Sequence, residues 1–220
     1  MNESFKTFSQ EKAEVRPQHS EINFEIRREA LPPLGDAEKK VSGYLSTVTG
    51  GVKFDVHVDS GVQILEVIRN TSQTTSLELT EAQALTLAPF LKRTDVSEVR
   101  IAKRDGTHDD EADAWVMKVK VGPIGEPTEQ TKITLTQEQK QILFSIADVV
   151  EKKRYYLPVA LVSDESVIVE VDEYPNGLWM AEVPVEAVDQ IEKNMPTWLG
   201  TKITEADAKS HAWQNIKSKA

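Results

Sequence analysis

The feature that most constrains the fold is an alternation of charged and apolar residues along short segments between Glu151 and Gly200. Successive residues of a strand point to opposite faces of a sheet, so this pattern predicts strands with a core on one face and charges on the other. Cations gather in Glu151–Pro158, whereas carboxylates occupy the next two segments, Val167–Tyr174 and Asn176–Val183. A solvated sheet face does not require this separation, but a closed channel that holds a metal and a polyanion does.

The composition narrows the class of protein. The 220 residues suffice for one large domain or two small ones, and 39% are apolar, enough to bury a core. The net charge of −10 argues against broad binding to nucleic acid or anionic membranes. The absence of cysteine excludes disulfides, thiolate metal sites and a cysteine nucleophile. No apolar run approaches the roughly 18 residues of a membrane span and the N-terminus lacks a signal-peptide core, so we expect a cytoplasmic protein.

The order of elements predicts an α+β fold. Glu21–Ala30 alternates as a half-buried strand and ends at Leu31–Gly35, because proline cannot sit in a central ladder. Further strands are predicted at Lys53–Val58, Val62–Arg69, Val96–Arg104, Ala114–Val121, Lys152–Leu157, Val159–Ser163, Ser166–Glu173 and Leu178–Val183, with a short helix at Val185–Lys193. Strands that connect mostly as antiparallel neighbours favour one large antiparallel sheet that can close into a barrel.

An internal similarity links two parts of the chain. Ser76–Gln83 resembles Lys132–Gln139, and each is predicted to be a strand that ends at a threonine N-cap, Thr80 or Thr136. Each helix that follows has an apolar stripe and leads to a basic strand. The predicted stripes are Leu85, Leu87 and Leu91 in the first helix and Ile142, Leu143, Ile146 and Val150 in the second. This repetition indicates approximate two-fold pseudosymmetry; the alternative is that such junctions simply look alike.

Charged residues at i, i+2 spacing share one face of each predicted strand. The sets are Glu25 with Arg27, Lys118 with Lys120, Lys152 with Arg154, Glu170 with Asp172, and Glu182 alone. Lys118 and Lys120 by themselves are better explained as a solvated face. Together, the separate cationic and anionic strands favour a site for a polyphosphate and a metal, because Lys and Arg bind phosphate oxygens and carboxylates bind Mg²⁺ or Mn²⁺.

The C-terminal half resembles the CYTH domain, also called the triphosphate tunnel metalloenzyme superfamily. Four motifs carry the resemblance, in the order of that family. They are Lys152-Lys153-Arg154-Tyr155, Glu170-Val171-Asp172, Gly177-Leu178-Trp179-Met180-Ala181-Glu182 and Pro196–Gly200. The resemblance implies an antiparallel eight-stranded β-tunnel with short flanking helices, which binds triphosphate compounds with Mg²⁺ or Mn²⁺.

The N-terminal half departs from the pattern of that family. The Glu-x-Glu-x-Lys signature of its first strand corresponds best to Asn23-Phe24-Glu25-Ile26-Arg27, so the first glutamate is replaced by asparagine. The Arg-x-Arg strand is reduced to Arg100–Lys103, and the last acidic pair to Glu182-Val183-Pro184. Each lost carboxylate removes a metal ligand or a residue that orients one, typically at a cost of about 10–100-fold in affinity or activity.

The domain organisation follows from the same comparison. We expect a flexible N-terminal arm at Met1–Ser20, a single tunnel domain over residues 21–200 and a polar tail over 201–220. The segment Ser46–Val99 is longer than the family usually has, so it is interpreted as an inserted or duplicated element.

The resemblance also implies the site. Its catalytic carboxylates would be Glu25, Asp172 and Glu182, which with Glu170 would hold Mg²⁺ or Mn²⁺. The triphosphate would bind to Arg27, Arg100, Lys118, Lys120, Lys152 and Arg154. The implied activity is triphosphate hydrolysis, with adenylyl cyclisation less favoured. Two alternatives stay open: an inactive binder of nucleotides or polyphosphate, and a protein-interaction module that uses Ser46–Val99 as its surface. A homodimer is also left open.

Overall fold

The computed structural model describes residues 21–46, 52–70, 73–103, 114–123, 126, 128–162 and 165–204. The predicted arm at 1–20 and the tail from residue 205 onward lie outside these ranges, so both stay predictions. Within the described residues no helix is long and apolar enough to cross a membrane.

The described chain forms twelve strands, three α-helices and one 3₁₀ helix. The strands are β1 (Glu21–Ile26), β2 (Glu38–Ser46), β3 (Lys53–Asp59), β4 (Val62–Asn70), β5 (Gln73–Leu79), β6 (Val96–Lys103), β7 (Trp115–Val121), β8 (Glu129–Thr134), β9 (Asp148–Ala160), β10 (Ser166–Glu173), β11 (Trp179–Pro184) and β12 (Leu199–Lys202). The helices are η1 (Arg28–Ala30), α1 (Glu81–Leu91), α2 (Gln137–Ile146) and α3 (Val185–Lys193). This confirms the predicted α+β class and its antiparallel sheet.

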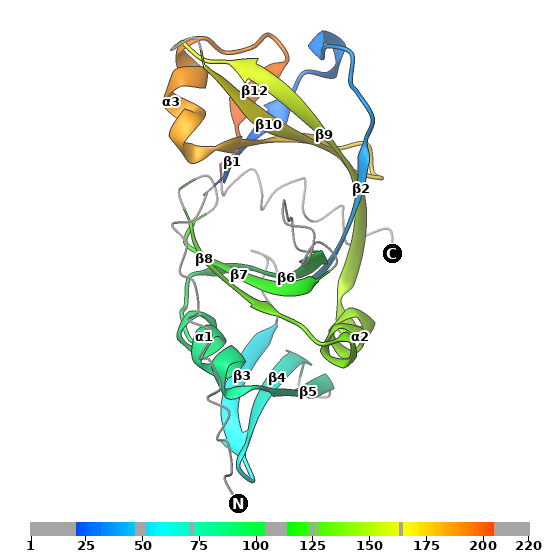
Figure 1. The fold of residues 1–220 in the computed structure, drawn as a ribbon, viewed down its shortest axis with the longest axis vertical. Helices are drawn as coiled ribbons and strands as arrows, with labels where there is room; N and C mark the ends of the chain where they lie inside the picture. Colours follow the sequence, from blue (N-terminus) through cyan, green and yellow to red (C-terminus); the bar gives the residue numbers. More distant parts are fainter. Residues whose placement is uncertain are drawn as a thin grey trace, which may run out of the picture.

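Nine strands form one sheet in the order β12-β1-β11-β10-β9-β2-β6-β7-β8, and β3-β4-β5 form a second sheet. Figure 1 shows two groups of strands, with β1 and β10–β12 at one end and β6–β8 nearer the other. β9 and β2 run between the two groups along one side of the molecule. The large sheet therefore bends so that both groups can direct side chains into the space between them.

The expected eight-stranded closed tunnel is wrong in strand number and in closure. The large sheet has nine strands and is open, because no ladder joins β8 to β1 or β12 in the described residues. On one edge β1 pairs with β11 through Glu21–Glu25, and on the other it pairs with β12 at Phe24 and Ile26.

Two apolar cores hold the two ends. One combines β4 and β5 with α1, β6–β8 and α2 around Leu65, Leu87, Ile101 and Leu143. The small sheet thus shares a core with β6–β8. The other core packs α3 and Trp198 against β1 and β9–β11. In α1 the predicted apolar stripe is partly wrong: Leu87 and Leu91 are buried, but Leu85 is 71% exposed.

Neither β2 nor the full length of β9 was predicted from the sequence. Sequence reasoning assigned no strand over Glu38–Ser46, and it divided Asp148–Ala160 into two strands. β2 lies between β6 and β9 and pairs with both. It can lie there because Gly43 has no side chain: a Cβ at this position would be 2.9 Å from the Cβ of Ala147.

The predicted internal similarity has a structural counterpart. Thr80 and Gln83 form a capping box at the start of α1, and Thr136 and Gln139 form the same box at the start of α2. The two glutamine side chains also contact each other, with Nε2 to Oε1 distances of 3.1 and 3.0 Å. The units β5-α1-β6 and β8-α2-β9 therefore meet at matching positions, and β6 and β9 flank β2 on either side.

The Gln139 side chain gives a test of this junction. It accepts a hydrogen bond from the backbone of Thr136 and donates to the carbonyl of Glu78 at 2.7 Å. Gln139→Ala should lower the free energy of unfolding by about 2 kcal/mol, because the capping hydrogen bond and the part-buried hydrogen bonds to Glu78 and Gln83 are lost. Gln141→Ala, on the exposed side of the same helix, is the matched control in urea denaturation. Equal effects of the two changes would contradict the structural role of Gln139.

Candidate functional site

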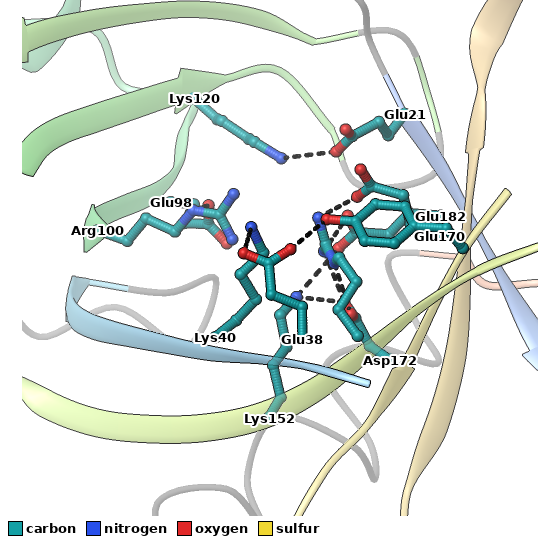
Figure 2. Close-up of polar contacts among 12 residues, drawn as sticks. Glu21, Glu38, Lys40, Glu98, Arg100, Lys120, Lys152, Glu170, Asp172 and Glu182 are labelled. Atoms are coloured by element: carbon teal, nitrogen blue, oxygen red, sulfur yellow. Dashed lines mark hydrogen bonds and ion pairs between the residues drawn. The ribbon is translucent and has the colours of Figure 1, made fainter. Parts of the chain in front are cut away.

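The two groups of strands direct charged side chains toward one another. Figure 2 shows Lys120 and Arg100 from β7 and β6 facing Glu21, Glu170 and Glu182 from β1, β10 and β11. These five residues and the charged side chains that pair with them or lie beside them are called the charged cluster. Its members are Glu21, Glu98, Arg100, Lys120, Lys152, Arg154, Glu170, Asp172 and Glu182.

The centre of the cluster is Arg154. Its Nε donates to Oδ1 of Asp172 at 2.7 Å, and its Nη2 donates to Oδ2 of Asp172 at 2.8 Å. Nη2 also donates to Oε2 of Glu182 at 2.7 Å. All three side chains are buried, so one guanidinium fork serves two carboxylates away from solvent.

Lys152 adds a second buried cation on the same face of β9. Its Nζ donates to Oδ2 of Asp172 and lies 3.6 Å from Oε1 of Glu182. The ammonium also lies 5.5 Å from the centre of the Tyr174 ring. The strand register explains the grouping, because Asp172 is the direct partner of Arg154 and Glu170 is the partner of Glu182.

Three carboxylates form a potential metal site inside the cluster. Oxygen atoms of Glu21, Glu170 and Glu182 lie within 4.8 Å of one another. Oε2 of Glu170 is buried and pairs with Arg154 without an aligned hydrogen bond. An all-oxygen donor set of this kind fits a hard cation such as Mg²⁺ or Mn²⁺.

The opposite side of the cluster comes from β6 and β7. Nε of Arg100 lies 3.2 Å from Oε1 of Glu98, and neither atom makes an aligned hydrogen bond in the described residues. Nζ of Lys120 reaches across to Oε2 of Glu21 at 3.9 Å. This ion pair links β7 to β1, each of which lies next to an edge strand of the open sheet.

The pKa values show how the carboxylates share charge. Burial raises the pKa of Glu170 to about 8; Arg154 opposes this shift, while Glu182 and Glu21 add to it. Burial also raises the pKa of Glu21. Glu182 is buried as well, but Lys152, Arg154 and two further cations hold its pKa well below the ordinary range. The cluster therefore favours the ionised form of Glu182 and the protonated form of Glu170.

The structure brings most of the predicted residues together. Arg100, Lys120, Lys152, Arg154, Glu170, Asp172 and Glu182 all belong to the charged cluster. Lys118 is half-buried and stands opposite Arg100 in the β6–β7 ladder.

Glu25 and Arg27 are not brought to the cluster. Glu25 is exposed, stands opposite Met180 rather than Glu182, and accepts a hydrogen bond from Thr201 at 2.8 Å. Arg27 is exposed and follows the end of β1. The position opposite Glu182 is Asn23, so Glu21 is the β1 carboxylate that reaches the cluster.

Sequence reasoning missed Glu21, Glu98 and the β2 residues Glu38 and Lys40. Glu21 and Glu98 lie at i, i+2 spacing from residues that were considered, Asn23 and Arg100, so the strand period could have found both. The signal for β2 is weak, because Ser42-Gly43 interrupts its pattern like a turn.

A second group of potential metal ligands lies on the small sheet. Ligand atoms of Asp55, His57 and Glu66 lie within 4.8 Å of one another, and Nδ1 of His57 is 2.9 Å from Oδ2 of Asp55. Asp55 is exposed and directly opposite Glu66 in the β3–β4 ladder. This group is separate from the charged cluster.

Comparisons with known proteins add a distant likeness. No protein-family model and no curated protein matches the chain. Among solved structures, the inorganic triphosphatase NE1496 is 17% identical, with 91% of this chain and 98% of that chain covered and a TM-score of 0.41. A structure of the hypothetical protein NE1496 is also 17% identical, with 89% and 96% covered and a TM-score of 0.40. At this level of likeness, the function has to be argued from the chemistry of the charged cluster.

The raised pKa of Glu170 predicts a pH-dependent stability of the metal-free protein. Its folded-state pKa of about 8 exceeds the ordinary 4.5, so folding favours the protonated carboxyl. The stabilisation is complete below the unfolded-state pKa and is lost as the pH rises through the folded-state pKa. Gln has no proton to lose, so Glu170→Gln should keep this stabilisation at every pH. The free energy of unfolding of the wild type should therefore fall relative to that of the variant between about pH 5 and about pH 8.

Urea denaturation in the presence of a chelator measures this difference. Other groups that titrate in this range are common to both proteins, so their contributions cancel in the difference. A constant difference across the range would contradict a protonated Glu170.

Proposed function

We propose that the protein binds a triphosphate or polyphosphate together with a divalent cation at the charged cluster, and that it hydrolyses a phosphoanhydride bond there. The observation that carries the proposal is the burial of Arg154 and Lys152 between Asp172 and Glu182, facing further cations from another group of strands. Buried ion pairs give little net stability over apolar packing, so a mixed cluster of this size is better explained by a ligand.

The charge balance favours a ligand that contains both phosphate and metal. Arg154, Lys152, Arg100 and Lys120 each already contact a carboxylate. A bare polyanion would have to displace these carboxylates, which leaves them buried without partners. A divalent cation on Glu21, Glu170 and Glu182 would compensate the carboxylates and release the Lys and Arg side chains for phosphate oxygens.

Each residue then has a role that follows from its chemistry. Glu21, Glu170 and Glu182 would hold Mg²⁺ or Mn²⁺, and Asp172 would keep Arg154 oriented. Lys120, Arg100, Lys152 and Arg154 would bind the phosphates and stabilise charge on the leaving phosphate. A bound divalent cation would add electrostatic stabilisation of the same charge. In this proposal Glu21 takes the role among the catalytic carboxylates that was assigned to Glu25 from the sequence.

A second candidate is binding without turnover. Asn23 stands opposite Glu182 and Glu25 lies outside the cluster, so β1 supplies one carboxylate where the family signature has two. Fewer metal ligands weaken catalysis before they weaken phosphate binding, because phosphate binding depends on the Lys and Arg side chains.

Thermal unfolding with tripolyphosphate and Mg²⁺ or Mn²⁺ tests the proposal. We expect the largest rise in Tm with both ligands together, and little with tripolyphosphate alone. A free ligand concentration of 100 times Kd would stabilise the folded protein by about 2.7 kcal/mol. Colorimetric phosphate release under the same conditions separates the hydrolase, which releases phosphate, from the binder, which does not.

Paired variants locate the effect. Glu21→Gln should abolish most of the metal-dependent rise, whereas Glu25→Gln should retain it. Lys120→Gln should weaken the response to tripolyphosphate, whereas Lys153→Gln should not, because Lys153 is exposed and pairs with Glu173 at 3.2 Å. No rise with any combination of ligands, or equal losses in the members of each pair, would sink the proposed site.

A further inference from the structure

The charged cluster continues into an exposed apolar surface on the same face of β9 and β10. In the ladder between these strands, Arg154 pairs with Asp172, the next pair on that face is Tyr156 with Glu170, and the following pair is Pro158 with Ile168. A strand rises about 3.3 Å per residue, so Tyr156 begins about 7 Å beyond Arg154.

The exposure of these residues changes sharply along the face. Arg154 is 5% exposed, whereas Tyr156 is 45% and Ile168 is 48% exposed. Pro158, the ladder partner of Ile168, is exposed as well. Apolar surface that adjoins a polar site and faces solvent is a common mark of a ligand-binding surface.

The other end of the charged cluster is covered. Val150 precedes Lys152 on the same face of β9, and it packs with Tyr44, Tyr174, Met180 and Ile203 in a small apolar core. All five are at most 7% exposed. A ligand whose phosphates contact Arg154 and Lys152 therefore extends toward Tyr156 and not toward Val150.

The ring of Tyr156 is held in place at its hydroxyl. This hydroxyl donates to Oε2 of Glu38 at 2.6 Å, and Glu38 also pairs with Lys40 at 2.7 Å. A ring fixed in this way loses little conformational entropy when a ligand packs on it. Aromatic side chains stack on planar rings with little dependence on the identity of the ring.

We propose that Tyr156, Pro158 and Ile168 form a subsite for the aromatic group of an organic triphosphate, such as the base of a nucleoside triphosphate. This rests on the proposed function, because it requires the phosphates to lie at the charged cluster. Inorganic tripolyphosphate would leave the three residues exposed. The preferred ligand is therefore a triphosphate ester that carries a planar ring.

Isothermal titration with ATP and with tripolyphosphate, each as a slowly hydrolysed analogue with Mg²⁺, tests the subsite on the full chain. Tyr156→Ala should weaken ATP about tenfold, as expected for a lost stacking contact, and change tripolyphosphate less than about twofold. Tyr156→Phe keeps the ring and should retain ATP binding. Val162→Ala shortens a more exposed apolar side chain, 61% exposed, in the turn after β9 and should change the binding of neither ligand. Ile168→Ser, on the opposite strand, should repeat the selective loss of ATP and serves if Tyr156→Ala does not fold.

Three results would overturn the subsite. Equal loss of both ligands in Tyr156→Ala and Ile168→Ser would place these residues in general support of the cluster. Unchanged ATP affinity, with a dimer that dissociates in the variants on sedimentation, would assign the surface to a second copy of the chain. Tripolyphosphate binding that is tighter than ATP binding in the wild type would assign the site to inorganic ligands. If the wild type binds neither ligand, the proposed function fails and the subsite fails with it.

Discussion

The contact of Arg154 with Asp172 and Glu182 is the interaction on which the rest of the structure depends. These three side chains join β9, β10 and β11 at the centre of the large sheet, away from solvent. Removing one partner of a buried ion pair typically costs about 3–5 kcal/mol, because the other charge is left uncompensated. Replacing all partners by apolar residues is often neutral. The contact therefore constrains every member of the cluster while giving the fold little net stability, as expected for a site that exchanges its partners with a ligand.

The bend of the large sheet sets the two sides of the charged cluster opposite each other. β2 and β9 connect the two groups of strands, so the cations of β6 and β7 face the carboxylates of β1, β10 and β11. The ion pair Lys120–Glu21 connects β7 to β1 across the sheet, and no ladder joins the end strands β8 and β12 in the described residues. A divalent cation and a phosphate chain would replace side-chain ion pairs of this kind without breaking backbone hydrogen bonds. The apolar surface at Tyr156 then adjoins the end of the cluster that faces solvent.

Strand alternation carried most of the sequence-based prediction. The spacing of Lys152 with Arg154 and of Glu170 with Asp172 placed both pairs on the correct face, because the period of a strand is fixed by its geometry. The same rule could not choose between Glu21 and Glu25, which share a face of β1. That choice depends on the register, which sets Asn23 opposite Glu182 and Glu25 opposite Met180. Sheet closure and the position of β2 were also beyond the sequence, since they depend on pairing between distant strands and on the close approach of Gly43 to Ala147.

The most direct measurement is an anomalous difference map from crystals grown with Mn²⁺ and a slowly hydrolysed triphosphate analogue. A manganese peak among Glu21, Glu170 and Glu182, with phosphate density at Arg154 and Lys120, is the predicted result. In that structure Lys152 and Arg154 would contact phosphate oxygens as well as Asp172. Ordered analogue bound elsewhere on the molecule, with the ion pairs of the charged cluster intact and free of metal, would contradict a triphosphate site at this position.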